Sequence, residues 1–267
     1  MQNDQRVDSA SERAPSIFEG LRVAVTGGTS GLGLALVREL HARGARVAFV
    51  ARGRERVVQI EREIAGVSGI VGDVSRKEDI HPIAIQILAR LNGLDVLVNN
   101  ASDLGPVPLA PLADTECEEL QRALDTNVLG PFRLTRALLV ALAASAREGR
   151  GAVVLNVSSD AAVSPYPDWG AYGASKAALH HLSRIWNVEL EDEGVHFLSL
   201  DPGDMDTPLH KLAVPNADTS TLKKPEAAAR EFLTAIAAAL PPRRDLGRSV
   251  AGRAGVAERT NGAVTAR

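Results

Sequence analysis

The sequence has little of several features that mark particular protein classes. It contains a single cysteine among 267 residues, which excludes an intramolecular disulfide and fits the reducing cytoplasm. Its formal net charge of −3 gives no indication of an electrostatic surface for nucleic acid. No run approaches the roughly 18–20 consecutive apolar residues of a membrane span. The start, Met1–Asp4, lacks the basic and apolar blocks of a secretory signal. We therefore expect a cytoplasmic protein that binds neither nucleic acid nor a membrane.

What the sequence does have is an alternation of strand and helix patterns. Six short apolar segments are expected to be strands, at about 21–26, 46–50, 68–72, 94–99, 152–158 and 195–200. Helical patterns lie at about 32–43, 53–65, 76–91, 114–147, 171–192 and 225–239. Strands that alternate with helices predict a parallel sheet with helices on both faces. The length and the hydrophobic content of 45% suit one large α/β domain.

The two ends of the chain lack this alternation. Residues 1–18 are polar and are expected to be disordered, which leaves 19–240 as the expected domain. Residues 241–267 are rich in Gly, Arg and Ala, with six arginines against two acidic residues, and are expected to form a flexible tail. The alternative is a tail that binds nucleic acid, which the acidic balance of the rest of the chain disfavours.

A glycine-rich turn follows the first expected strand. Residues 21–26 run into a turn with glycines at 27, 31 and 33, and a helical pattern follows directly. Glycines let the backbone approach a pyrophosphate, and a helix N-terminus offers free N–H groups and a positive dipole. No Lys-Ser or Lys-Thr pair follows, so a Walker-type nucleoside triphosphate loop is excluded. The sequence predicts an anion site suited to a pyrophosphate; the alternative is a flexible turn with incidental glycines.

Tyr172 and Lys176 stand four residues apart in an expected helix, so they share one face. A free tyrosine has a pKa near ~10, too high for ready proton exchange at neutral pH. A cation about 4–6 Å away favours the phenolate and lowers such a pKa by roughly 1–3 units. The pair therefore predicts a tyrosine that acts as an acid/base; the alternative is a solvated helix face.

Together these residues resemble the classical short-chain dehydrogenase/reductase family, from about Leu21 to Ala239. Six family motifs occur in order and at the family's spacing: Thr26-Gly27-x3-Gly31-Leu32-Gly33, Gly72-Asp73-Val74, Asn99-Asn100-Ala101-Ser102, Asn127, Ser159 thirteen residues before Tyr172, and Pro202-Gly203-x3-Thr207. Ser102 stands where the family usually has glycine. The resemblance implies a Rossmann-type, doubly wound parallel sheet in three layers and a single domain. The family usually ends with a seventh strand, for which only Arg248–Val250 is a candidate here.

The resemblance also implies catalytic roles for four residues. The Ser159 hydroxyl hydrogen-bonds the substrate oxygen beside Tyr172, the proton donor. Ser158 is its rival, and only the thirteen-residue spacing favours Ser159. Lys176 lowers the pKa of Tyr172 and binds the nicotinamide ribose. Asn127 distorts its helix and holds a water that links Lys176 to solvent.

A nicotinamide cofactor is implied as the hydride carrier. The glycines of the turn face its pyrophosphate, Asp73 its adenine, and Asn99 with Ala101 its adenosine ribose, while Pro202, Gly203 and Thr207 contact its nicotinamide end. The expected cofactor-binding residues are Thr26, Gly27, Thr29, Ser30, Gly31, Leu32, Gly33, Arg52, Asp73, Val74, Asn99, Ala101, Tyr172, Lys176, Pro202, Gly203 and Thr207.

The end of the second strand indicates which cofactor is preferred. NAD-preferring enzymes place an acidic residue there for the ribose 2′-hydroxyl. This chain has Ala51 and then Arg52, whose guanidinium suits a phosphate dianion. NADP(H) is therefore favoured, with NAD(H) possible; the alternative is that Arg52 and Arg54 only begin a solvated helix.

A metal site is not expected. Asp201, Asp204 and Asp206 could suggest a hard-cation site, but a cation needs more ligands than this turn offers, and the stretch fits the nicotinamide-side loop.

The expected function is an NADP(H)-dependent oxidoreductase that transfers a hydride between the nicotinamide and a small carbonyl or secondary alcohol, with Tyr172 as proton donor or acceptor. The alternative is a non-catalytic dinucleotide-binding sensor or scaffold; such proteins usually lose Tyr, Lys or Ser, and all three remain here. Segments 102–108, 160–169 and 205–224 should cover the substrate, but they indicate no ligand class. The expected helices over 114–147 and 171–192 form the subunit contact in most of the family, which implies a homodimer or homotetramer.

Overall fold

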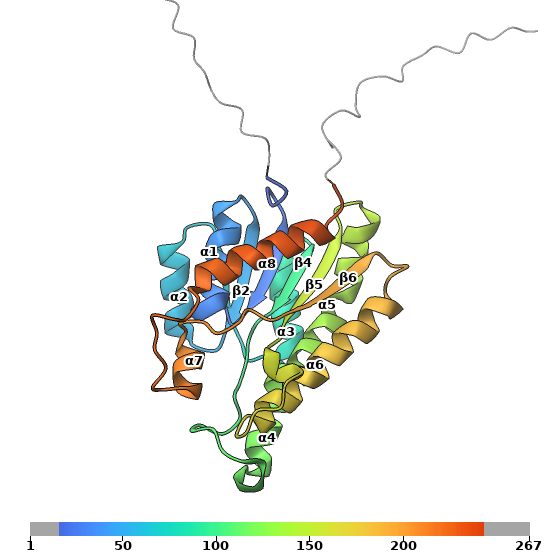
Figure 1. The fold of residues 1–267 in the computed structure, drawn as a ribbon. Coiled ribbons are helices and arrows are strands. Elements are labelled where there is room, and N and C mark those ends of the chain that lie inside the picture. The colour runs from blue at the N-terminus through green and yellow to red at the C-terminus, as the bar shows by residue number, and fades with distance from the viewer. Residues whose placement is uncertain (1–15, 243–267) are drawn as a thin grey trace, which may run out of the picture.

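A six-stranded parallel sheet forms the centre of the protein, which a computed structural model describes over residues 16–242 (Figure 1). The strands run in the order β3-β2-β1-β4-β5-β6. Their bounds are β1 Arg22–Thr26, β2 Arg46–Ala51, β3 Ser68–Val71, β4 Val96–Asn99, β5 Ala152–Val157 and β6 Val195–Leu200. All six predicted strands are confirmed. The order of the strands reverses between β1 and β4, because later strands are added on the other side of β1, and ligands of open α/β sheets bind at the carboxyl ends of strands at such a point.

Side chains of the strands alternate between two hydrophobic cores, because successive residues of a strand point to opposite faces. Along β1, Val23 and Val25 lie in one core and Ala24 in the other. The first core is completed by helices α1 and α8, and the second by α3 and α5. Figure 1 shows α1 and α8 across one face of the sheet. The predicted three-layer, doubly wound fold is therefore confirmed.

The helices differ from the predicted ones at two places. Their bounds are α1 Gly31–Ala42, α2 Arg54–Glu63, α3 Lys77–Leu91, α4 Cys117–Leu124, α5 Gly130–Arg147, α6 Gly170–Glu189, α7 Pro208–Ala213 and α8 Pro225–Ala239. The helix predicted over 114–147 begins at Cys117, and a π-helical turn, Asp125–Leu129, separates its two parts, α4 and α5, at the Asn127 that was expected to distort it. The prediction also missed α7, although Thr207 and Pro208 are a typical N-cap and first residue of a helix.

By length and composition alone, the segment Cys117–Arg147 could cross a membrane, which no stretch was expected to do. Half of its most apolar window is buried inside the fold, where α5 packs against α3 and the sheet. A core helix passes the same test of length and composition, so this segment is weak support for a membrane span.

The described domain begins before the expected boundary at residue 19. Phe18 is buried and belongs to the core beside α1 and α8, so the disorder expected up to residue 18 is corrected for residues 16–18. Its ring packs in that core, which the polar composition of the preceding segment did not indicate. The rest of that segment, and the possible seventh strand Arg248–Val250, lie outside the described residues.

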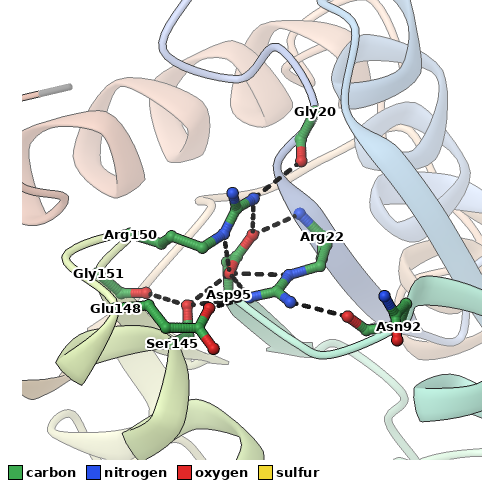
Figure 2. Close-up of polar contacts among 8 residues, drawn as sticks. All are labelled: Gly20, Arg22, Asn92, Asp95, Ser145, Glu148, Arg150 and Gly151. Atoms are coloured by element: carbon green, nitrogen blue, oxygen red, sulfur yellow. Dashed lines mark hydrogen bonds and ion pairs between the residues drawn. The ribbon is translucent and has the colours of Figure 1, made fainter. Parts of the chain in front are cut away.

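The amino edge of the sheet is held by a buried carboxylate, Asp95, just before β4 (Figure 2). Its two oxygens accept hydrogen bonds from Arg22 Nε at 3.0 Å and Arg150 Nη2 at 2.9 Å, and the Ser145 hydroxyl also donates to it. Burial alone would raise the pKa of Asp95, but the hydrogen bonds from Arg150, Arg22 and Ser145 outweigh it and hold the pKa at about 2. This network ties β1, β4 and the end of α5 together at the edge opposite the glycine turn.

Candidate active site

The glycine turn is fixed by hydrogen bonds between the ends of β1 and β4. Asn100 Nδ2 donates to the carbonyl oxygens of Thr26 at 2.9 Å and Gly27 at 3.3 Å. In return, Thr26 Oγ1 accepts from the backbone N–H groups of Asn100 at 3.0 Å and Ala101 at 3.1 Å. Asn100 belongs to one of the motifs named above but was not predicted as a site residue. Its place directly after an apolar strand could have indicated this role.

Two glycines of the turn are required by close approach. A Cβ on Gly33 would lie 2.2 Å from the Gly27 carbonyl oxygen, where no side chain fits. Gly27 has a φ of +68°, and a Cβ there would lie 2.9 Å from Asn100 Nδ2. The start of α1 is therefore bare backbone, which suits an approaching phosphate.

A cavity of about 430 Å³ opens over this turn. Fourteen of the predicted site residues line it: Gly27, Thr29, Ser30, Gly31, Leu32, Gly33, Arg52, Asp73, Val74, Ala101, Tyr172, Lys176, Pro202 and Thr207. Thr207 lies close over the turn, since a Cβ on Gly31 would be 3.1 Å from its methyl carbon. The bare glycine backbone and the helix N-terminus are of the kind that binds the pyrophosphate of a dinucleotide. We call this space the cofactor cavity.

Three predicted site residues line neither the cofactor cavity nor the second cavity that adjoins it, which is described below. Thr26 is buried and supports the turn instead. The Asn99 side chain points into the protein, where its Nδ2 donates to Asn156 Oδ1 at 2.8 Å. Asn127 is fully buried behind Tyr172's helix. For Asn99, the sequence identified the right segment and the wrong direction, because the alternation at the last residue of β4 points it inward.

A second cavity of about 480 Å³ adjoins the first. Ser159 and Gly203 line it, and Tyr172, Pro202 and Thr207 line both cavities. Tyr172 therefore stands where the two spaces meet. We call the second space the substrate cavity.

The substrate cavity carries negative charge. Asp160, Asp201 and Asp204 line it, and no lysine or arginine is among the described residues that do so. Burial would raise the pKa of Asp160, but hydrogen bonds from the hydroxyls of Tyr166, at 2.8 Å, and Ser159, at 3.0 Å, outweigh it and hold the pKa below its ordinary value.

The relation between Tyr172 and Lys176 differs from the prediction. Burial raises the pKa of Tyr172 to about 12, and the nearby hydroxyls of Ser159 and Ser102 act in the opposite direction. Lys176 is 2% exposed, and burial lowers its pKa to about 8. Its Nζ donates to the Val157 carbonyl oxygen at 2.8 Å and lies 5.4 Å from the centre of the Tyr172 ring. In the protein alone, desolvation thus dominates both groups, so the pKa of Tyr172 lies above its ordinary value even though Lys176 is nearby.

Asn127 sits in the π-helical turn and joins three segments. Its Nδ2 donates to the Asp103 carbonyl oxygen at 2.7 Å and to Ser175 Oγ at 2.8 Å, and its Oδ1 accepts from the Asp103 N–H at 2.8 Å. These bonds explain the irregular helix, because the extra residue of the turn directs the amide inward.

Arg52 is exposed at the end of β2 and lines the cofactor cavity. Within residues 16–242 it makes no hydrogen bond or ion pair, so its guanidinium is available to a ligand. Arg56 lies near the same end of the cavity, where its Nε donates to the Thr29 carbonyl oxygen at 3.3 Å. Arg56 was not predicted as a site residue, because it lies in α2 among other charged residues that are typical of a solvated helix face.

Comparisons with known proteins agree with this geometry. The family model described as short chain dehydrogenase matches residues 22–218. A short chain dehydrogenase of Pseudocercospora fijiensis is 35% identical over 207 residues, which cover 75% of this chain and 64% of that protein, slightly less than two thirds of its length.

Two solved structures are similar in fold. One is a 3-ketoacyl-(acyl-carrier-protein) reductase from Brucella melitensis in complex with NADH, with 26% identity, a TM-score of 0.75 and coverage of 81% of this chain and 90% of that one. The other is a short chain dehydrogenase from Shigella flexneri in complex with NADP, with 25% identity, a TM-score of 0.72 and coverage of 79% and 89%. The glycine turn, the two adjoining cavities and these matches lead to one conclusion: the chain belongs to the short-chain dehydrogenase/reductase family of NAD(P)-dependent oxidoreductases.

Proposed function

We propose that the protein is an NADP(H)-dependent oxidoreductase that interconverts a small carbonyl compound and a secondary alcohol, with Tyr172 as the proton donor or acceptor. One observation carries this proposal: Tyr172 lines both the cofactor cavity and the substrate cavity. A group in that position can exchange a proton with an oxygen of one ligand while the adjacent carbon faces the other ligand.

When bound, the nicotinamide supplies or accepts the hydride at the substrate carbon. In the reductive direction, the phenol of Tyr172 gives its proton to the oxygen of the carbonyl, and the phenolate that remains must be stabilised. Ser159 donates a hydrogen bond to the substrate oxygen from the wall of the substrate cavity. Lys176 lies near enough to the Tyr172 ring to oppose the phenolate charge when it is protonated.

Asn127 affects Tyr172 indirectly, through its contact with α6. It holds Ser175, one turn along α6 from Tyr172, at 2.8 Å. It is therefore a positioning residue for α6, and a water near it would link Lys176 to solvent so that the phenolate regains its proton. This uptake of one proton from solvent completes the balance of one hydride and one proton for each carbonyl reduced.

The preference for NADP(H) rests on Arg52, which has no protein partner among the described residues and lines the cofactor cavity. Ala51 precedes it at the position where an acidic residue would select NAD(H). A guanidinium that is not yet paired can form a forked, charge-assisted contact with a 2′-phosphate.

The test is a titration of the purified protein with NADPH and NADH, followed by fluorescence. Trp169 lies 5.6 Å from the Tyr172 ring and should report binding. We expect tighter binding of NADPH, and Arg52→Ala should weaken NADPH by about tenfold or more while it leaves NADH nearly unchanged, since charged hydrogen bonds are worth about 1.5–3 kcal/mol. Equal binding of the two cofactors, or no effect of Arg52→Ala, would refute the preference; binding of neither would refute the function.

We also propose a cytoplasmic homodimer or homotetramer. The single cysteine supports a reducing compartment. Val140 of α5 and Val188 of α6 are 79% and 73% exposed, and such apolar side chains on the two helices support a subunit contact there. Light scattering at low and high protein concentration tests the assembly.

A further inference from the structure

Ser102 has a hydroxyl without a hydrogen-bond partner. Its Oγ is the one buried side-chain nitrogen or oxygen atom in residues 16–242 that has none of normal geometry. Burial of a hydroxyl without a partner is unfavourable, and such groups in folded proteins ask for an explanation. Ser102 lines the cofactor cavity together with Tyr172 and Lys176, so its hydroxyl is available to a group in that cavity.

The backbone directly after Ser102 is fixed against the helix that carries Tyr172. The amide of Asn127 binds both the N–H and the carbonyl oxygen of Asp103, at 2.8 and 2.7 Å, and also holds Ser175 in α6. The Ser175 hydroxyl donates in turn to the Tyr172 carbonyl oxygen at 2.6 Å. A rigid chain of contacts therefore connects the neighbour of Ser102 to Tyr172 itself.

The next residues add apolar contacts to the same place. Leu104 and Tyr172 belong to one buried cluster. Gly105 approaches α6 so closely that a Cβ on it would lie 2.8 Å from the Ala171 Cβ. The segment that follows Ser102 is thus held by packing against α6, and Ser102 and Tyr172 line the same cavity before any ligand arrives.

We propose that Ser102 is a positioning residue whose hydroxyl donates a hydrogen bond to the Tyr172 oxygen when that oxygen has lost its proton. This inference rests on the proposed role of Tyr172. A hydroxyl that gains its partner only in the phenolate stabilises the charged form more than the neutral one. The direction agrees with the effect of Ser102 on the Tyr172 pKa, which it lowers together with Ser159. Glycine, the residue that the family usually has here, cannot do this.

The composition of the chain makes the inference directly measurable. The protein contains two tyrosines, Tyr166 and Tyr172. In a Tyr166→Phe background, the absorbance of tyrosinate near 295 nm therefore reports Tyr172 alone, and no cofactor or substrate is needed. Rapid pH jumps read the ionisation before alkaline unfolding, and circular dichroism at each pH verifies the fold.

We expect Ser102→Ala to raise the titration midpoint of Tyr172 by about half to one pH unit, a three- to tenfold weaker acid. Ser102→Thr, which keeps the hydroxyl, should restore the midpoint. Ser158→Ala is the matched control, because Ser158 lines both cavities, whereas Ser102 and Ser159 are the hydroxyls that lower the Tyr172 pKa. If Ser102→Ala does not fold, Ser102→Gly carries the same test.

An unchanged midpoint in Ser102→Ala or Ser102→Gly would overturn the inference, and so would an equal shift in Ser158→Ala. A second readout is the pH profile of kcat/KM for a reduced carbonyl, whose limb assigned to Tyr172 should move in the same direction. Because the titration needs no turnover, its failure would leave the proposed function standing. Loss of the proposed function would show instead as absent cofactor binding or as full activity without the Tyr172 hydroxyl.

Discussion

The burial of the charged Lys176 should destabilise the folded protein, so removal of its charge should stabilise the fold. The side chain is 2% exposed, and its Nζ donates to one carbonyl oxygen, that of Val157. Among the described residues it forms no salt bridge with a carboxylate. An ammonium in this position is buried without a counter-charge in contact, which is unfavourable.

The magnitude follows from the pKa. Burial lowers the pKa of Lys176 from 10.5 to about 8, and each unit corresponds to 1.36 kcal/mol, so the charged form costs about 3 kcal/mol. Between pH 8 and 10.5 the unfolded chain binds a proton that the folded chain does not, so the free energy of unfolding rises with pH in that range. The penalty is therefore fully present below pH 8 and vanishes above pH 10.5.

Lys176→Met, which keeps the length of the side chain, should raise the free energy of unfolding at pH 7 by about 1–3 kcal/mol, the lost hydrogen bond to Val157 offsetting part of the gain. Urea unfolding at pH 7 and pH 10 measures the effect, and the gain should shrink at the higher pH. Lys77→Met, at an exposed lysine in α3, is the control and should change stability by less than about 0.5 kcal/mol at both pH values. A variant less stable than the unmodified protein at pH 7, or a gain that does not depend on pH, would refute the reasoning.

Four further predictions concern other parts of the molecule. Asp95→Asn should lower the free energy of unfolding by about 3–5 kcal/mol, because it leaves Arg22 and Arg150 without their buried partner, while KM values stay unchanged. The same carboxylate stabilises the fold above pH 3.8, and this contribution should be lost as pH falls through about 2, measured by acid titration of the unmodified protein against Asp95→Asn. Gly33→Ala should abolish NADPH binding, since its Cβ would lie 2.2 Å from a backbone oxygen, whereas Gly53→Ala, with its nearest neighbour at 4.0 Å, should bind normally in the same titration. A ketone that carries a carboxylate should be reduced with a kcat/KM at least several-fold below that of a neutral isostere, because Asp160, Asp201 and Asp204 line the substrate cavity; equal rates would show that this charge does not reach the substrate.

Local patterns in the sequence were sufficient for the parts of the site that lie within one turn or one helix. The glycines at 27, 31 and 33 and the pair Tyr172 and Lys176 could be placed because strand, turn and helix periods fix their directions over a few residues. The six strands could be predicted for the same reason, since each is a short apolar segment.

Features that depend on distant contacts could not be predicted. Asp95 meets Arg22 and Arg150, which lie 73 and 55 residues away in the chain. The orphaned hydroxyl of Ser102 depends on Asn127 and α6, and the low pKa of Lys176 depends on how the whole domain closes over it. Sequence spacing gives residue types and local faces, whereas burial and its electrostatic consequences require the packed structure.

The central claim is that the phenol of Tyr172, which lies where the two cavities meet, exchanges a proton with the substrate oxygen, and Tyr172→Phe tests it most directly. The measurement is the oxidation of NADPH at 340 nm with a carbonyl compound that the unmodified protein reduces, together with NADPH binding by the variant. We predict that the variant binds NADPH as tightly as the unmodified protein and that its kcat falls by about 100-fold or more, the usual contribution of a general acid. A variant that keeps its kcat would contradict the claim.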